Sequence, residues 1–143
     1  MARGNRFRIY DAERNLDRLY FSSTEAAQGW LNWVCRTKWW KQHTTIKHVD
    51  LLYPTFSMSG SEKVDDSLGR IEVYATSLEV LTLCHELAHL IDWRPRTNSQ
   101  ERCHDAQFAG VCLSVVKRYM GAKWALKLAE YYEAEGVKII PYE

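Results

Sequence analysis

The chain has 143 residues, of which 46% are hydrophobic and 26% charged, and its formal net charge is +1. This length suits one compact core, so we expect a single domain over residues 1–143, and the balanced charge indicates no obligatory polyanion partner. No apolar run is long enough to span a membrane, and the N-terminal segment MARGNRFRIYDAERN lacks the hydrophobic region of a secretory signal. We therefore expect a cytoplasmic protein with reduced cysteines.

The first elements along the chain are two short strand candidates and a helix. The strand candidates are Phe7–Tyr10 and Leu19–Phe21, on either side of a turn at Asp11–Asp17. Ser22–Glu25 has the Ser/Thr-x-x-Glu pattern of a capping box, which predicts a helix running to about Trp40.

Basic and aromatic residues alternate at the end of this predicted helix, over Arg36–His43. Residues 1–48 also hold nine Lys and Arg against four Asp and Glu. Such a segment either contacts nucleic acid, through phosphates and stacked bases, or is a helix end with buried tryptophans and solvated lysines. We favour the second interpretation, so nucleic acid is a possible partner but not the favoured one.

The middle of the chain predicts a small sheet. Ile46–Tyr53 and Arg70–Tyr74 alternate enough between apolar and polar residues to be strands. Between them Ser57–Leu68 is polar and contains Gly60, which predicts a loop or hairpin. Together with the helices, these strands indicate an α+β fold with a short antiparallel or mixed sheet.

The most informative motif follows the second strand. His85-Glu86-Leu87-Ala88-His89 matches HExxH, in which two imidazoles one helical turn apart converge on a metal and the glutamate acts as general base. Thr76–Glu79 is a capping-box candidate for this helix, with Thr76 as N-cap. On a helical wheel the three motif residues fall within an arc of about 100°. Leucines and other apolar residues occupy the opposite side: Val80, Leu83, Leu87, Leu90 and Ile91.

A catalytic zinc usually takes three protein ligands and leaves one position for water. A third histidine at the close spacing of HExxHxxGxxH would fall on Pro95, so the next candidate is His104. Asn98–Glu101 is a capping-box candidate that predicts a new helix, and Glu101 is the rival third ligand. On that helix His104 belongs to an inward-facing stripe with Phe108, Val111, Cys112, Val115 and Tyr119.

The last predicted element is a helix over Ala122–Glu135, closed by Gly136. The cysteines form no CxxC pair, and Cys84 and Cys103, which each precede a candidate ligand, do not share the helix face of that ligand. We therefore expect no structural zinc from Cys35, Cys84, Cys103 and Cys112, and interpret Cys35 and Cys112 as small core residues.

The two histidine motifs resemble those of a known family. HELAHLID, followed by His104-Asp105-Ala106-Gln107-Phe108, resembles the HELAH…HGxxF pattern of small metallohydrolases of actinobacteria and their phages, distant relatives of SprT-like zinc peptidases. The segments Arg8–Glu13 and Ala129–Val137 also resemble this family, so the likeness covers most of the chain. It differs at Asp105, where the family pattern has Gly.

The resemblance implies a zincin-like fold: a sheet packed on the HExxH helix, with two further C-terminal helices, in the host cytoplasm if a phage encodes the chain. In zinc peptidases of this type, a sheet edge holds an extended substrate by strand addition. We therefore expect the edge of Arg70–Tyr74, or the loop Ser57–Leu68 folded over it, to line a groove open to a polypeptide.

We thus predict a Zn²⁺-dependent metallohydrolase with His85, His89 and His104 as ligands and Glu86 as general base. A metallopeptidase with a protein or peptide substrate is the leading interpretation. The alternatives are an amidase or other small-molecule hydrolase, and a zinc-containing binding protein without turnover; an intact Glu86 favours the two enzymes. No membrane partner is expected, and the oligomeric state is left open.

Two sets of supporting residues remain open in the sequence. An oxyanion stabiliser is needed, and the candidates are His48, Arg70, Tyr74 and Tyr119. Asp92 and Asp105 lie next to candidate ligands, where each either holds the second nitrogen of a ligand or is a surface carboxylate.

Overall fold

The computed structural model describes residues 4–94 and 103–143 of the chain. It divides into two compact units, which we call the sheet unit, Arg18–Ile91, and the helical unit, Met1–Asp17 with Asp92–Glu143. The described residues form a three-stranded mixed sheet and six helices, so the predicted α+β class is confirmed. None of the described helices is long and apolar enough to cross a membrane.

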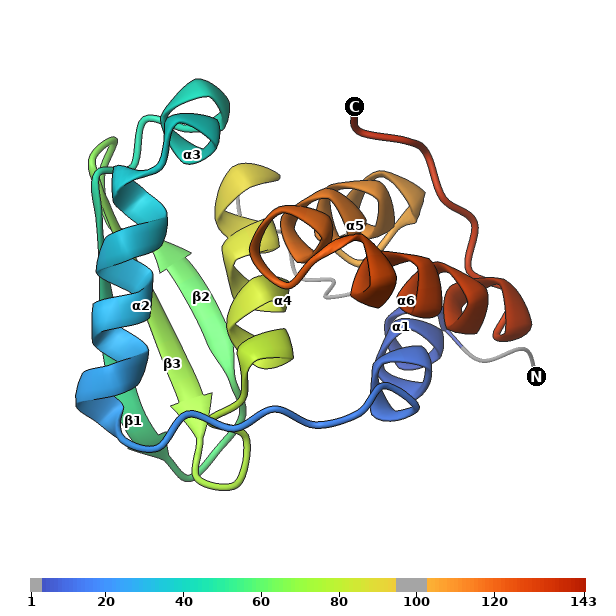
Figure 1. Ribbon diagram of the computed structural model, residues 1–143, viewed down its shortest axis with the longest axis horizontal. Helices are drawn as coiled ribbons and strands as arrows, with labels where there is room; N and C mark the ends of the chain where they lie inside the picture. The colour runs from blue at the N-terminus through green and yellow to red at the C-terminus, as the bar shows by residue number, and fades with distance from the viewer. Residues whose placement is uncertain (1–3, 95–102) are drawn as a thin grey trace. The chain divides into compact units, whose positions relative to one another are not determined.

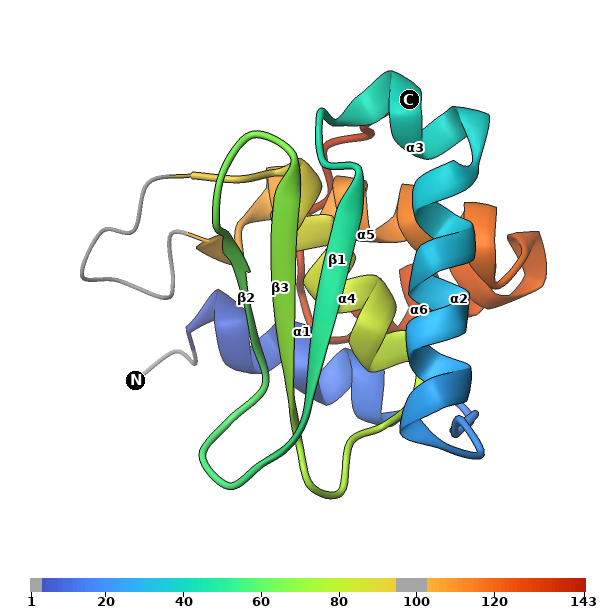
Figure 2. The same ribbon diagram turned by 90° about the vertical axis from the view of Figure 1, so that its left-hand side faces the viewer.

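The sheet has the strand order β1-β3-β2 (Figure 2). β1 (His48–Thr55) runs parallel to the central strand β3 (Leu68–Tyr74), and β2 (Gly60–Lys63) runs antiparallel to it. The two predicted strands are thus confirmed with ends shifted by about two residues. The polar segment between them forms a hairpin arm that contains β2.

The central position of β3 contradicts one expectation. Arg70–Tyr74 was expected to present an exposed edge, but β3 is paired on both sides. The sequence alternation identified the strand correctly, yet it carries no information on strand order. The polar hairpin arm pairs along β3 and covers its second side.

Helix α4 (Val80–Ile91) packs against β2 and β3 (Figure 1). The two elements approach closely at Gly69 of β3, where an added Cβ would lie 3.0 Å from a methyl carbon of Leu90. Residues alternate in direction along a strand, so Ile71 and Val73, both fully buried, share the α4 side of the sheet with Gly69. The absence of a side chain at Gly69 therefore lets the metal-motif helix approach the central strand.

The start of α4 corrects the predicted cap. Helical structure begins at Val80, and Thr76 is not its N-cap. The preceding residues are held in extended pairing instead: the Phe21 N–H donates to the Leu78 carbonyl at 3.0 Å, and the Val80 N–H donates to the Leu19 carbonyl at 2.9 Å. The predicted strand Leu19–Phe21 thus exists only as an isolated bridge between Tyr20 and Glu79.

The helix predicted to run to about Trp40 is two helices, α2 (Thr24–Arg36) and α3 (Lys38–His43). Ser23 is the N-cap of α2, and its side chain accepts a hydrogen bond from the Ala26 N–H. Thr37 has extended backbone dihedral angles between the helices, and its hydroxyl donates to the Val34 carbonyl and accepts from the Trp40 N–H. A threonine hydroxyl that bonds to nearby backbone offers the chain an alternative to a continuous helix.

The described part of the helical unit contains α1 (Asn5–Arg14), α5 (Ala106–Tyr119) and α6 (Ala122–Ala134). The predicted strand Phe7–Tyr10 and the turn after it are therefore wrong, because this segment is α1. Its inward residues, Ile9 and Ala12, are three positions apart and fully buried, which is helical rather than strand periodicity.

The predicted end of the last helix is confirmed. Glu135 is the C-cap of α6, and Gly136 follows with φ 75°, a left-handed conformation that glycine adopts without a steric penalty.

Candidate metal centre

His85 and His89 lie one turn apart on α4 and face each other. Their Nε2 atoms are 3.2 Å apart, and the ring planes are inclined by 71°. Two nitrogens of a tetrahedral zinc site, each about 2.0–2.1 Å from the ion, are roughly 3.3–3.4 Å apart. The separation of these two nitrogens therefore fits two ligands of one zinc ion.

Glu86 and His85 are nearly inaccessible, with 6% and 4% of their surface exposed, and His89 is half-buried. The apolar side of the helix is formed by Leu83, Leu87 and Leu90, which are buried as predicted. Ionisable side chains are costly to bury unless they are paired or bind a metal. Burial of two imidazoles and a carboxylate on one helix face is thus the chemistry expected of a metal-binding motif.

His104 lies in the helical unit, and the structure corrects its local setting. It precedes α5 rather than belonging to it, because Asp105 is the N-cap and its Oδ1 accepts from the Phe108 N–H at 3.0 Å. The other stripe members behave as predicted, with Phe108, Val111, Cys112 and Val115 buried and Tyr119 half-buried. The capping box Asn98–Glu101, including the rival ligand Glu101, lies outside the described residues.

Two residues of α1 contact His104. Asn5 donates a hydrogen bond from Nδ2 to the His104 carbonyl, and the Tyr10 hydroxyl lies 3.4 Å from His104 Nε2. The ring centroid of His104 lies 5.3 Å from that of Tyr10 and 5.2 Å from that of Phe108, and both contacts are edge-on. These contacts hold a nearly buried imidazole in one orientation. That His104 binds the same metal ion as His85 and His89 stays a prediction. Asn5 and Tyr10 are not among the predicted site residues, because the segment Phe7–Tyr10 was expected to be a strand and forms part of α1.

Asp92 and Asp105 are joined by an arginine that the sequence did not single out. Arg94 donates to both carboxylate oxygens of Asp105, at 2.7 and 2.9 Å, and to Asp92 at 2.7 Å. Gln107 donates to the second oxygen of Asp92 at 2.6 Å. The Arg94 hydrogen bonds hold the pKa of Asp105 below its ordinary range, whereas burial raises the pKa of Asp92 despite the nearby guanidinium.

The direction of the side chains in the sheet argues against three of the four candidates for the oxyanion stabiliser. Arg70 and Tyr74 alternate with the residues that face α4, and therefore lie on the opposite side of the sheet. His48 pairs with Leu68 in the same outward row and bonds to Asp50 at 2.6 Å. These three side chains thus point away from the metal-motif helix. The role of Tyr119 as an oxyanion stabiliser stays a prediction.

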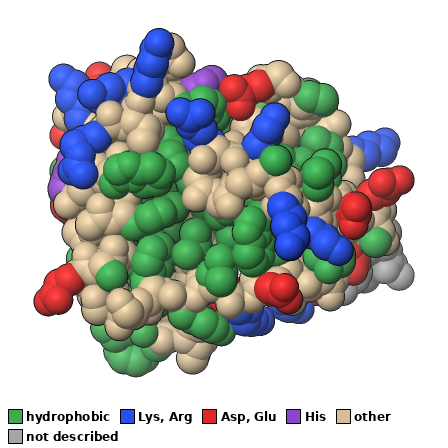
Figure 3. Space-filling view, viewed as in Figure 1, with side chains coloured by type: hydrophobic (Ala, Val, Ile, Leu, Met, Phe, Trp, Pro, Cys, Tyr) green, Lys and Arg blue, Asp and Glu red, His purple; other side chains and the backbone are tan. Residues whose placement is uncertain are grey.

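The basic segment around α3 fits the interpretation favoured from the sequence. Trp39 and Trp40 are buried, and the Trp40 indole N–H donates to the Ile46 carbonyl at 2.7 Å. Lys38 and Lys41 are exposed. Lys and Arg side chains gather at the upper left of the face shown in Figure 3. The burial of both indoles fits the interpretation as a helix end, and a nucleic-acid partner stays a prediction.

Cys35 and Cys112 are buried, which confirms their interpretation as core residues, and all four cysteines are free thiols. The expectation of no structural zinc from the cysteines stays a prediction. Burial raises the pKa of Cys35 to about 11, which makes this thiol a poor metal ligand at neutral pH.

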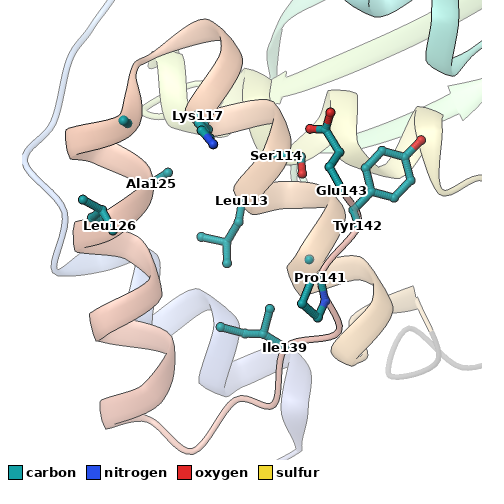
Figure 4. Close-up of a pocket in the computed structure, with 11 residues that line it drawn as sticks. Leu113, Ser114, Lys117, Ala125, Leu126, Ile139, Pro141, Tyr142 and Glu143 are labelled. Carbon is teal, nitrogen blue, oxygen red and sulfur yellow. The ribbon is translucent and has the colours of Figure 1, made fainter.

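A separate hollow of about 500 Å³ lies in the helical unit, between α5, α6 and the C-terminal segment (Figure 4). Its lining is mostly apolar and includes Leu113, Leu126 and Ile139. None of the predicted ligands lines it, nor does Glu86, so this hollow is not the substrate pocket that an amidase at the motif would need.

No family model, curated protein or solved structure matches the chain. The resemblance noted in the sequence therefore stays an expectation, and the case for the site rests on its own residues.

Proposed function

We propose that the protein is a zinc-dependent hydrolase, with His85, His89 and His104 as ligands and Glu86 as general base. The observation that carries this proposal is the pair of Nε2 atoms 3.2 Å apart on α4, together with the buried Glu86 that directly follows His85 in the same helix. A neutral histidine pair sharing one proton would have a similar separation. It would give no reason for a buried carboxylate at the next position.

When bound by His85, His89 and His104, zinc would polarise a substrate carbonyl and lower the pKa of a water molecule to near 7. The carboxylate of Glu86 would take one proton from the attacking water and pass it to the leaving amine.

We propose a polypeptide as the substrate, held along the sheet by strand addition. The edge at β1 is closed to such a substrate by Gln28 of α2. The Gln28 side chain accepts from the Leu51 N–H at 2.9 Å and donates to the Val49 carbonyl at 2.8 Å. Within the described residues, this leaves β2 as the strand on which an extended chain would pair.

The register of β2 identifies the atoms for this pairing. The Val64 N–H donates to the Leu68 carbonyl, and hydrogen-bonded and non-hydrogen-bonded pairs alternate along an antiparallel ladder. The pair Glu62–Arg70 is then hydrogen-bonded, and the pair Lys63–Gly69 is not. The backbone N–H and carbonyl of Lys63 therefore point outward, on the strand that packs against α4.

A small-molecule amidase is the second candidate, and one observation favours it. β2 has only four residues and carries Glu62 and Lys63, and short charged edges also serve to prevent aggregation. If β2 has that role alone, the same zinc chemistry acts on a smaller amide.

The test compares wild type with Glu86→Gln and His85→Ala on a library of unmodified proteome-derived peptides, with new termini detected by mass spectrometry. Glu86→Gln should keep zinc and fold but lose cleavage, whereas His85→Ala should lose zinc and stability, because metal binding contributes folding energy. Cleavage of small amides but not peptides would favour the amidase. Full turnover by Glu86→Gln would refute the general-base role.

A further inference from the structure

We infer that Arg94 is a positioning residue for the third metal ligand, acting through Asp105 on the backbone of His104. The inference rests on the proposed function, because it assigns Arg94 to the same metal centre. It concerns the helical unit alone, where all the contacts that carry it are found.

The first step is the geometry of the Arg94–Asp105 pair. Both terminal nitrogens of the guanidinium donate to the carboxylate, one to each oxygen, at 2.7 and 2.9 Å. Such a two-point pair fixes direction as well as distance, which a single contact or a lysine does not. The pair joins residues that are 11 positions apart in the sequence, so it is a tertiary constraint and not a local turn.

The second step is the position of Asp105 itself. It directly follows His104, and its Oδ1 also accepts the Phe108 N–H at the first turn of α5. One carboxylate therefore fixes the backbone between the ligand and the helix that follows it. Arg94 restrains that carboxylate, and the Asn5 contact restrains the His104 carbonyl from the other side.

The third step is the anchor of Arg94. Its guanidinium also donates to Asp92, whose side chain is only 4% exposed and whose other oxygen accepts from Gln107. Asp92 immediately follows the last residue of α4, the helix that carries the first two ligands. The chain leaving the HExxH helix and the chain carrying His104 are thus tied to one guanidinium, which restrains the third ligand independently of any metal.

The experiment measures zinc affinity by chelator competition in the full chain. Loss of a residue that orients a ligand typically weakens metal binding about 10–100-fold. Arg94→Met should therefore bind zinc at least about tenfold more weakly than wild type, and Arg94→Lys should recover little, because it keeps the charge but not the fork. Arg118→Met, which removes an exposed arginine from the last turn of α5, is the matched control and should bind as wild type.

Asp105→Asn separates positioning from helix capping. Asparagine still caps a helix but cannot form the charged two-point pair. Asp105→Asn should weaken binding as much as Arg94→Met, and the double variant should be no weaker than either single variant. At saturating Co²⁺, Arg94→Met should also show a weaker visible absorption band, because a four-coordinate site that loses its third imidazole takes up extra water.

The outcomes distinguish the two proposals. If wild type takes up no zinc, the proposed function fails. If wild type binds zinc and Arg94→Met matches it in affinity and in the Co²⁺ spectrum, the inference about Arg94 is wrong and the function stands. A weaker affinity with an unchanged Co²⁺ spectrum would show a general loss of stability, and would also overturn the positioning role.

Discussion

Gln28→Ala tests whether one side chain closes the β1 edge of the sheet. The substitution removes the two hydrogen bonds between Gln28 and the backbone of β1, at 2.8 and 2.9 Å, and a third from the Gln28 amide to Asn32 Oδ1 at 3.0 Å. A typical intramolecular hydrogen bond contributes about 0.5–1.5 kcal/mol net, so the loss of the two bonds to β1 alone should lower the free energy of unfolding by about 1–3 kcal/mol. Alanine keeps the helical preference of α2, so the helix itself should not be weakened.

Urea unfolding followed by circular dichroism measures the change. The matched control is Gln42→Ala, which changes an exposed glutamine of α3. Hydrogen exchange provides a local check, since the Leu51 amide should exchange faster in Gln28→Ala alone. The newly opened edge should also promote self-association at high concentration, measured by sedimentation velocity. Wild-type stability together with unchanged protection at Leu51 would refute the role of Gln28, and would leave both sheet edges as candidates for substrate binding.

Two further predictions concern β2 and a buried thiol. Lys63→Pro removes an outward N–H without touching the ladder to β3, so it should weaken peptide binding at least several-fold while zinc stays bound. Lys63→Ala, which keeps the N–H, should bind normally, and equal binding by both variants would contradict strand addition at β2. Because burial raises the pKa of Cys35 to about 11, its contribution to stability is present below about pH 9 and is lost as the pH rises toward 11. At pH 8 Cys35 should therefore react with thiol reagents only on unfolding, after the half-exposed Cys103; equally fast labelling of both would show that Cys35 is accessible.

Elements were predicted correctly where the local sequence pattern agrees with the burial of one face. This holds for helix α4, for strands β1 and β3, and for the end of α6. The HExxH spacing placed two imidazoles on one face, because helix geometry alone decides that relation.

The failures share a different cause, which is contacts between residues distant in sequence. Phe7–Tyr10 alternates like a strand but packs as α1, and the first turn expected at Thr76 is replaced by pairing with residues 19–21. The central place of β3 follows from a hairpin arm whose pairing no single strand pattern contains.

The sequence does contain a local signal for the place of His104. Asp105 lies three residues before the apolar period that begins at Phe108, which is typical of an N-cap, and it places the start of α5 after His104. Arg94 carried no such signal, because its partners become neighbours only in the folded chain.

The number of histidine ligands on bound zinc tests the central claim most directly. X-ray absorption at the zinc edge, on wild-type protein purified without chelator, should show one zinc per chain with three imidazole nitrogens at about 2.0–2.1 Å and one oxygen. The His104→Ala protein should lose one of the three imidazoles. Protein that takes up no zinc, or zinc whose spectrum is the same with and without His104, would contradict the proposed site.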